Sequence, residues 1–535
     1  MSIRLKTNWI KLQHRRPRLL SKEAVQLTSF RLPVLSFYKN LVLASSVMPL
    51  ISYVTCSMLV VPLLACFTIS TISVQNRASA VKVQKLGLVS MIMTFALSMV
   101  LWFNFDSRSH DFQFTFDLCN RRFLNFEVGI DGTSLYFVCL TTFIMPIALL
   151  SNWANIRHSV KLYVISFLLV ERLLLITFTV LDILLFYIFF ERVLIPLFLI
   201  VGIWGGSPVR VRAALLLFLY TLFGSLFMLI GFVYLYDCTG TTAFESVAVN
   251  SVSMTDQTVL FICIFLRMAI KTPLMPFNTW LTYAHAEAPV GGSIVLAGLI
   301  LKLATYGYLR IMVQFVPDSC EAFAPIIQTI SVMTLVYARL RCLRQTDFKK
   351  LVAYSRVAHQ AIMVLGVFSF TLQGLEGAII LGLAHGLVSP GLFFACGGVL
   401  YDRYHTRVIK YYRGMTTYMP VFAIFFFIFT VANAAVPLRA NWIGEFLCLI
   451  GVYMSNPVIA LFASLTIVFS ACYSILLFNR MSFLDMSQYC EGMLDVNRRE
   501  VMVMLPLVIM TVVLGFYPNL VLQDLHVSMT NLISH

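Results

Sequence analysis

Charged residues are scarce in this 535-residue chain. Only 12% of its residues are Asp, Glu, Lys or Arg, and 59% are hydrophobic. An ordinary soluble domain is about 25% charged and about 45–50% apolar. A surface this poor in charge is solvated mainly by lipid. The composition therefore argues against a soluble globular protein and predicts an integral membrane protein.

Cysteine is present, but it lacks the spacing of a metal site or a disulfide framework. Twelve cysteines are scattered from Cys56 to Cys490, and no two form a Cys-x-x-Cys pair. Several lie inside apolar runs, where cysteine behaves as a small hydrophobic residue; these include Cys263, Cys396 and Cys448. The pattern argues against an iron–sulfur cluster held by this chain alone.

Long apolar runs dominate what the sequence does contain. A membrane-spanning helix needs roughly 20 mainly apolar residues, and only helices or closed barrels satisfy their backbone in lipid. We therefore predict an all-α polytopic fold with about 14 transmembrane helices. Their expected positions are 47–73, 86–105, 133–151, 162–180, 182–204, 213–236, 257–277, 289–312, 323–338, 351–373, 376–400, 418–437, 456–478 and 501–522.

Basic residues between the spans predict the orientation. The net charge of +15 would suggest nucleic acid in a soluble protein, but here most Lys and Arg lie in the odd-numbered loops. The even-numbered loops contain little beyond Arg108, Arg121, Arg122 and Arg310. By the positive-inside rule the odd loops face the cytoplasm or matrix, so both termini face the opposite side. No nucleic-acid partner is expected.

The first 40 residues disagree with this orientation. They are rich in Lys and Arg and contain one acid, Glu23, which makes them too polar for another span. A targeting-like presequence is one interpretation, because such segments are basic and poor in acids. We favour the other, an extension that lies on the surface or on a neighbour.

Two spans are interrupted by proline beside a charged residue. The sequence reads RMAIKTPLMPF at 267–277 and ANAAVPLRANWIGEF at 432–446. Pro273, Pro276 and Pro437 remove backbone donors, which is tolerated in a membrane only where neighbours or water satisfy the freed groups. Two such breaks five spans apart predict an internal repeat, as in many transporters. Two ordinary proline kinks are the alternative.

Titratable side chains lie within or at the edges of the spans, although a charge at the bilayer centre costs about 2.5–3.5 kcal/mol on insertion scales. Such groups must pair or meet water. A chain of them, each responding to its neighbour's charge, could relay protons. Capping, hydrogen bonding or a structural ion pair remains the alternative for each, and haem ligation by the histidines is disfavoured. The candidates are Glu171, Asp182, Glu191, Lys271, Lys302, His359, His385 and Glu445.

One long segment resembles a known family. Residues 271–310, KTPLMPFNTWLTYAHAEAPVGGSIVLAGLILKLATYGYLR, resemble the signature of subunit 4 of mitochondrial respiratory complex I, the NADH:ubiquinone oxidoreductase. DILLFYIFFERVLIPLFLIVGIWGG, YSRVAHQAIMVLGVF, LAHGLVSPGLFFACGGVLYDRYHTR and NWIGEF follow the family order as well, so the match covers about residues 125–480.

The resemblance implies a fourteen-helix, antiporter-like module with two inverted five-helix repeats, broken in segments 7 and 12. The implied division is a basic extension at 1–40, helices 1–3 at 41–161, the first repeat at 162–312, the second at 313–480, and helix 14 with a tail at 481–535. The implied location is the mitochondrial inner membrane, with odd loops in the matrix and both termini in the intermembrane space.

The implied function is proton translocation driven by electron transfer elsewhere in the complex. No cofactor is expected in this chain, while NADH, FMN, iron–sulfur clusters and ubiquinone are expected in other subunits. The implied partners are membrane-arm subunits, especially the antiporter-like subunits 2 and 5. Two rivals stay open: a subunit of a multi-subunit cation/proton antiporter, and a scaffold whose proton path has decayed.

The resemblance also implies residue roles. Glu191 would pair with Lys271, Lys302 would be the central lysine, His359 and His385 would lie on the central axis, and Glu445 would be the exit acid. Arg407 would be structural, and Glu171 matches an acid common in mitochondrial members.

Some residues depart from the family pattern. These are Asn278, Thr282, Tyr283, Arg267, Arg356 and Arg439, and Arg439 could pair with Glu445. These departures bear on the charges along the proposed proton path, and not on which family the chain resembles.

Overall fold

The computed structural model describes residues 48–534 except 122–123, 250–251, 484, 486 and 491–493. The predicted N-terminal extension, residues 1–40, lies outside the described residues. Residues 51–534 belong to one unit of the chain, and this unit contains all the candidate site residues.

Each of the fourteen apolar runs coincides with helix, as predicted. The first three spans are α2 (Met48–Thr71), α3 (Arg77–Asn104) and α4 (Gly132–Ser151). Only 33% of the apolar window of α2 or α3 is buried within the protein, against 78% for α4. Thus α4 belongs to the protein core, while α2 and α3 leave most of their surface to the surroundings.

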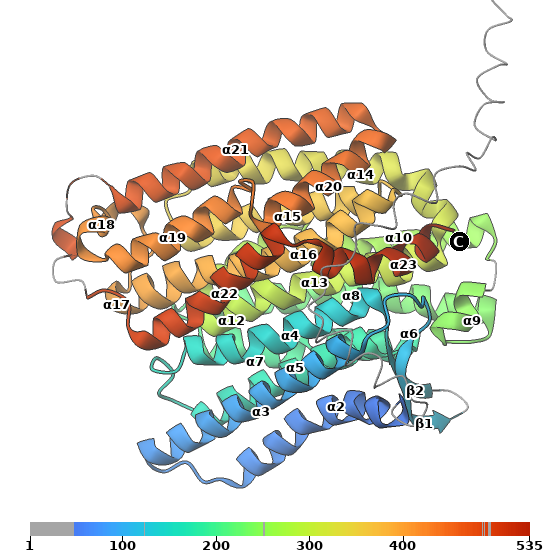
Figure 1. Ribbon diagram of the computed structural model, residues 1–535, viewed down its shortest axis with the longest axis horizontal. Coiled ribbons are helices and arrows are strands. Elements are labelled where there is room, and N and C mark those ends of the chain that lie inside the picture. Colours follow the sequence, from blue (N-terminus) through green and yellow to red (C-terminus); the bar gives the residue numbers. More distant parts are fainter. Residues whose placement is uncertain are drawn as a thin grey trace, which may run out of the picture. The chain divides into compact units, whose positions relative to one another are not determined.

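Spans 4 to 8 form the middle of the chain (Figure 1). The elements are α5 (Val160–Thr179), α6 (Ile183–Arg192), α7 (Leu194–Trp204), α8 (Arg210–Thr239), α9 (Phe244–Val249), α10 (Met254–Lys271), α11 (Thr279–Glu287), α12 (Val290–Val295), η1 (Leu296–Ile300), α13 (Leu301–Gly307) and η2 (Tyr308–Val313). Here η1 and η2 are π-helical turns within span 8.

Spans 9 to 14 make up the C-terminal half. Their elements are α14 (Pro317–Leu343), α15 (Phe348–Val367), α16 (Leu372–Phe393), the π-helical η3 (Phe394–Tyr401), α17 (Asp402–Tyr404), η4 (Ile409–Tyr411), α18 (Met415–Tyr418), α19 (Pro420–Asn433), α20 (Ala440–Ser455), α21 (Pro457–Ser482), η5 (Gln488–Cys490), α22 (Arg498–Phe516) and α23 (Asn519–Ser534). In Figure 1 the long helices of this half run alongside one another.

Both predicted helix breaks are present. In segment 7, α10 ends at Lys271 and α11 begins at Thr279; in segment 12, α19 ends at Asn433 and α20 begins at Ala440. At the second break Ala435 and Leu438 have φ of 55° and 69°, a left-handed conformation that is uncommon for residues other than glycine. The backbone therefore leaves the helix in both segments next to a charged side chain.

A β-hairpin that the sequence did not predict lies in the loop between spans 2 and 3. Strands β1 (Gln113–Arg121) and β2 (Leu124–Ile130) pair antiparallel, at one end of the helices in Figure 1. The Leu181 N–H donates to the Glu127 carbonyl at 3.0 Å, which ties the hairpin to the start of α6. The segment is too short and too polar to span, so it carries no membrane signal of its own.

The two most enclosed spans are the eighth and eleventh, whose apolar windows are completely buried. Both contain π-helical turns, which occur frequently at functional sites because they leave backbone groups without regular partners. In span 8, η1 and η2 flank the short α13 that carries Lys302. These irregular spans bury two of the candidates, Lys302 and His385, completely.

Candidate functional site

A buried lysine–histidine pair lies at the centre of the molecule. The Lys302 ammonium on α13 is 3.2 Å from Nδ1 of His385 on α16, and both side chains are completely buried. The same ammonium donates to the Ala297 carbonyl at 3.4 Å, and Ala297 belongs to η1. The irregular turn therefore supplies one of the two contacts that hold Lys302.

A second pair continues the row. The ring centres of His385 and His359 are 4.9 Å apart, and Nδ1 of His359 on α15 lies 2.7 Å from Oε1 of Glu445 on α20. Four of the eight candidates thus form one buried row drawn from four different helices, namely Lys302, His385, His359 and Glu445.

Glu445 has a second cationic neighbour that the sequence analysis did not find. Nη2 of Arg339 is 3.7 Å from Glu445 Oε1, and Nη1 of Arg339 donates to Thr466 Oγ at 2.9 Å. The sequence pattern places Arg339 in a basic loop, but α14 continues to Leu343 and buries it. The suggested Arg439–Glu445 pair is wrong, because Arg439 is at the N-cap of α20 and Arg339 lies beside the carboxylate instead.

Glu191 and Lys271 are arranged differently from the predicted pair. Nη2 of Arg267 lies 2.6 Å from Glu191 Oε1, whereas the Lys271 ammonium has no hydrogen-bond partner among the described residues. It lies 4.9 Å from the ring centre of Phe190. The predicted Glu191–Lys271 ion pair is therefore not present in the described part of the chain. Arg267 and Lys271 are one turn apart on α10, and the longer guanidinium takes the carboxylate.

Arg356 joins His285 to the central row. Nη1 of Arg356 is 2.9 Å from His285 Nε2, and Nη2 donates to Ser389 Oγ at 3.3 Å. The Ser389 hydroxyl in turn donates to the His385 carbonyl at 2.7 Å. Arginine has no acceptor, so His285 accepts at Nε2 and is neutral in this arrangement. The sequence analysis noted Arg356 but not His285. The residues on either side of His285 are alanines, and they do not mark it as a site residue.

Asp182 has a structural role. Its carboxylate accepts from the Leu185 N–H at 2.9 Å as the N-cap of α6, and from the Thr242 hydroxyl at 2.5 Å. These contacts favour the capping interpretation over a place in a relay.

Glu171 is fully buried on α5, and its hydrogen bond runs to α3. The Thr94 hydroxyl donates to Oε1 at 2.5 Å, while Oε2 has no hydrogen-bond partner within the described ranges. This bond joins α5 to α3, and neither helix carries a member of the row from Lys302 to Glu445. A role for Glu171 in that row stays a prediction.

Arg407 ties the loop between α17 and η4 to the end of α11. Its Nη1 lies 3.1 Å from Glu287 Oε1 and 2.5 Å from the Ala286 carbonyl. Glu287 also accepts from the Ser207 hydroxyl. These contacts connect three loops at one end of the helices, which supports the structural interpretation of Arg407.

Comparisons with known proteins agree with this architecture. The family model described as "NADH:quinone oxidoreductase/Mrp antiporter, TM" matches residues 180–472. That range includes both helix breaks and every residue of the central row.

Two curated relatives are similar over most of their length. NADH-ubiquinone oxidoreductase chain 4 of Mycosarcoma maydis is 55% identical over 476 residues, covering 89% of this chain and 98% of the relative. The protein of the same name from Arabidopsis thaliana is 43% identical over 456 residues, covering 85% and 92%.

Two solved structures share the fold. A chain of respiratory complex I from Thermus thermophilus superposes with a TM-score of 0.80 at 27% identity, covering 89% of this chain and 99% of the other. A chain of the Mrp complex from Dietzia gives 0.79 at 19% identity, covering 91% and 98%. The second likeness concerns the fold alone.

Proposed function

Because this chain belongs to the family of NADH-ubiquinone oxidoreductase chain 4, we propose a route by which its buried charges carry protons. The protein is a multi-pass, proton-translocating membrane-arm subunit of mitochondrial complex I. The route begins at Glu191 and Lys271, crosses the centre through Lys302, His385 and His359, and ends at Glu445. The observation that carries it is the buried row from Lys302 to Glu445.

The row has the chemistry that proton transfer needs. A neutral imidazole has one donor and one acceptor nitrogen, so it can accept a proton at one and release a proton from the other. His385 uses Nδ1 toward Lys302, and His359 presents Nδ1 to Glu445. The Nε2 atoms of the two rings have no hydrogen-bond partners in the part of the chain that the structure describes. A proton would cross between them after a ring rotation or through one water.

The entry group works as a switch. Glu191 has two cations one turn apart, Arg267 and Lys271, and it bonds to Arg267 in this structure. Moving the carboxylate toward Lys271 would favour the protonated lysine, and moving it back would favour release of that proton toward Lys302. The driving force is thus an electrostatic shift of one ion-pair partner.

The route also fixes the expected surroundings. We place Glu445 on the intermembrane-space side and the odd-numbered loops in the matrix. The two inverted repeats occupy 162–312 and 313–480. The antiporter-like subunits 2 and 5 are the proposed neighbours, and NADH, FMN, iron–sulfur clusters and ubiquinone belong to other subunits.

Lys302→Ala tests the route. The purified complex is reconstituted in liposomes, and proton translocation is measured together with NADH:ubiquinone reduction. We expect assembly and electron transfer to persist while the number of protons moved per electron falls, because the central row loses its first group. An unchanged ratio would remove Lys302 from the route. Lys161→Ala is the control, since that ammonium bonds the Ser70 and Ile72 carbonyls at helix ends, away from the row.

Copurification tests the first rival, the cation/proton antiporter. A complex that carries flavin and iron–sulfur clusters supports the respiratory function. A redox-free assembly that exchanges sodium for protons supports the antiporter. The scaffold alternative is favoured by one observation, the Arg267–Glu191 pair, which occupies the entry carboxylate. A complex with normal proton stoichiometry after loss of Lys302 and Glu445 would support that alternative.

A further inference from the structure

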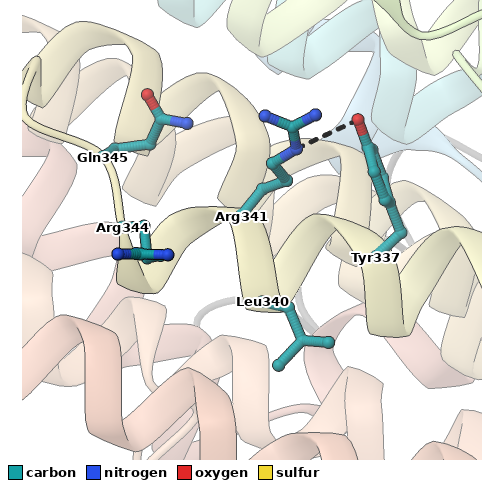
Figure 2. Close-up of a pocket in the computed structure, with 5 residues that line it drawn as sticks. All are labelled: Tyr337, Leu340, Arg341, Arg344 and Gln345. Carbon is teal, nitrogen blue, oxygen red and sulfur yellow. Dashed lines mark hydrogen bonds between the residues drawn. The ribbon is translucent and has the colours of Figure 1, made fainter.

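A surface hollow lies at the C-terminal end of α14. It has a volume of about 360 Å³ and is lined by Tyr337, Leu340, Arg341, Arg344 and Gln345. Figure 2 shows Arg341 beside the Tyr337 ring, with the dashed line marking the bond from Nε to the phenol oxygen at 3.1 Å. This bond uses only Nε, so within the described part of the chain the two terminal nitrogens of Arg341 remain available to a ligand.

A second, smaller hollow adjoins the first and brings in the neighbouring helix. The two share Gln345, and the second is also lined by Leu476 and Arg480 of α21. The exposed side chains of Arg341, Arg344 and Arg480 therefore gather at one end of the α14–α21 pair. The nearest acid along the chain, Asp347, already accepts the Lys349 and Lys350 N–H groups as the N-cap of α15.

An apolar stripe leads away from these arginines along each helix. On α14 it consists of Ile326, Met333 and Leu340, and on α21 of Leu461, Val468 and Ile475; these six side chains are 47% to 66% exposed. The seven-residue spacing places each set on one helix face. Fourteen residues of helix rise about 21 Å, which is longer than one leaflet of a hydrocarbon core about 30 Å thick.

We propose that this face binds an anionic phospholipid. Its phosphate lies between Arg341 and Arg344, with the Gln345 amide as a further donor, and its acyl chains run along the two stripes. The exposed arginines complement an anionic headgroup, and the two stripes run far enough into the membrane to accommodate acyl chains. An anionic headgroup is favoured because a zwitterionic one would bring its own cation toward the arginines. The site is independent of the proton route.

Photocrosslinking of the intact complex tests the proposal. The complex is reconstituted in phosphatidylcholine vesicles with a trace of phosphatidylglycerol that carries a photoreactive headgroup. A matched phosphatidylcholine probe is used in parallel. We expect the phosphatidylglycerol probe to label the peptide containing residues 337–345 more strongly. Each arginine near an anionic surface contributes about 1 kcal/mol, so each one removed should weaken binding about fivefold.

Arg341→Gln with Arg344→Gln is the test variant, and Arg77→Gln with Lys85→Gln is the control, because it removes two exposed cations from another predicted odd loop. Loss of labelling in the test variant alone supports the site. Equal labelling by both probes, or labelling that persists in the test variant, overturns it. The comparison of probes on the unaltered complex remains decisive if the variant fails to assemble.

Discussion

Both halves of the chain contain a broken membrane helix near a buried charged residue, but the two residues have opposite charge. Each breaks a membrane helix beside a charged side chain, Lys271 at the end of α10 and Glu445 in α20. Each also has a buried arginine bonded or close to a carboxylate, Arg267 near Glu191 and Arg339 near Glu445.

The difference lies in what remains after the arginine has paired. In the first half the Lys271 ammonium has the Phe190 ring as a neighbour and no hydrogen-bond partner among the described residues. In the second half the Glu445 anion lies between two cationic or titratable groups, Arg339 and His359. A buried charge that lacks a partner is costly. We therefore expect Lys271 to exchange its contacts more readily than Glu445, which has two close partners.

Glu445→Gln should have the largest effect, because it removes the anion from two buried neighbours. Breaking a buried ion pair costs about 3–5 kcal/mol, so we expect lower thermal stability of the complex as well as loss of proton translocation. Both are measured on the purified complex, with exposed Glu321→Gln as control. Full stability and full translocation together would show that Glu445 is not held as described.

Arg267→Leu should have an intermediate effect, because it frees Glu191 for Lys271. Lys271→Ala should then matter more in the Arg267→Leu background than alone. A double-mutant cycle on the thermal stability of the complex should give an interaction energy within roughly 0.5–3 kcal/mol. Additive effects would mean that Glu191 does not choose between the two cations.

Asp182→Ala should destabilise the protein by about 1 kcal/mol, because α6 loses its N-cap. Asp182→Asn retains an acceptor for the Leu185 N–H and should recover most of that stability. Proton translocation per electron should be unchanged in both variants. A selective loss of translocation in Asp182→Asn would instead place this carboxyl on the route.

Glu171→Gln should have the smallest effect. The amide can accept the Thr94 hydroxyl in place of the carboxyl, and a neutral hydrogen bond contributes about 1 kcal/mol. Translocation is compared with that of Glu445→Gln in the same liposome assay. A similar loss in both variants would extend the relay from the second half to α5.

Local sequence features predicted much of the site. Lys302, His359, His385 and Glu445 all stand out because a titratable group in an apolar run is costly, and the structure brings them into one row. The sequence did not predict that Arg339 is buried, because a basic residue at the end of an apolar run cannot be distinguished from a loop residue by sequence. Only the extra turns of α14 and its packing against α21 bury it.

The sequence by itself determined the spans, the two breaks and the four titratable residues of the central row, because apolar length, proline and charge act on the backbone where they stand. The tertiary structure alone decided which charges meet. Glu191 bonds to Arg267 rather than Lys271, and Glu445 meets Arg339 rather than Arg439. A pairing depends on how helices far apart in the chain are rotated and placed against one another, and no local pattern specifies that geometry.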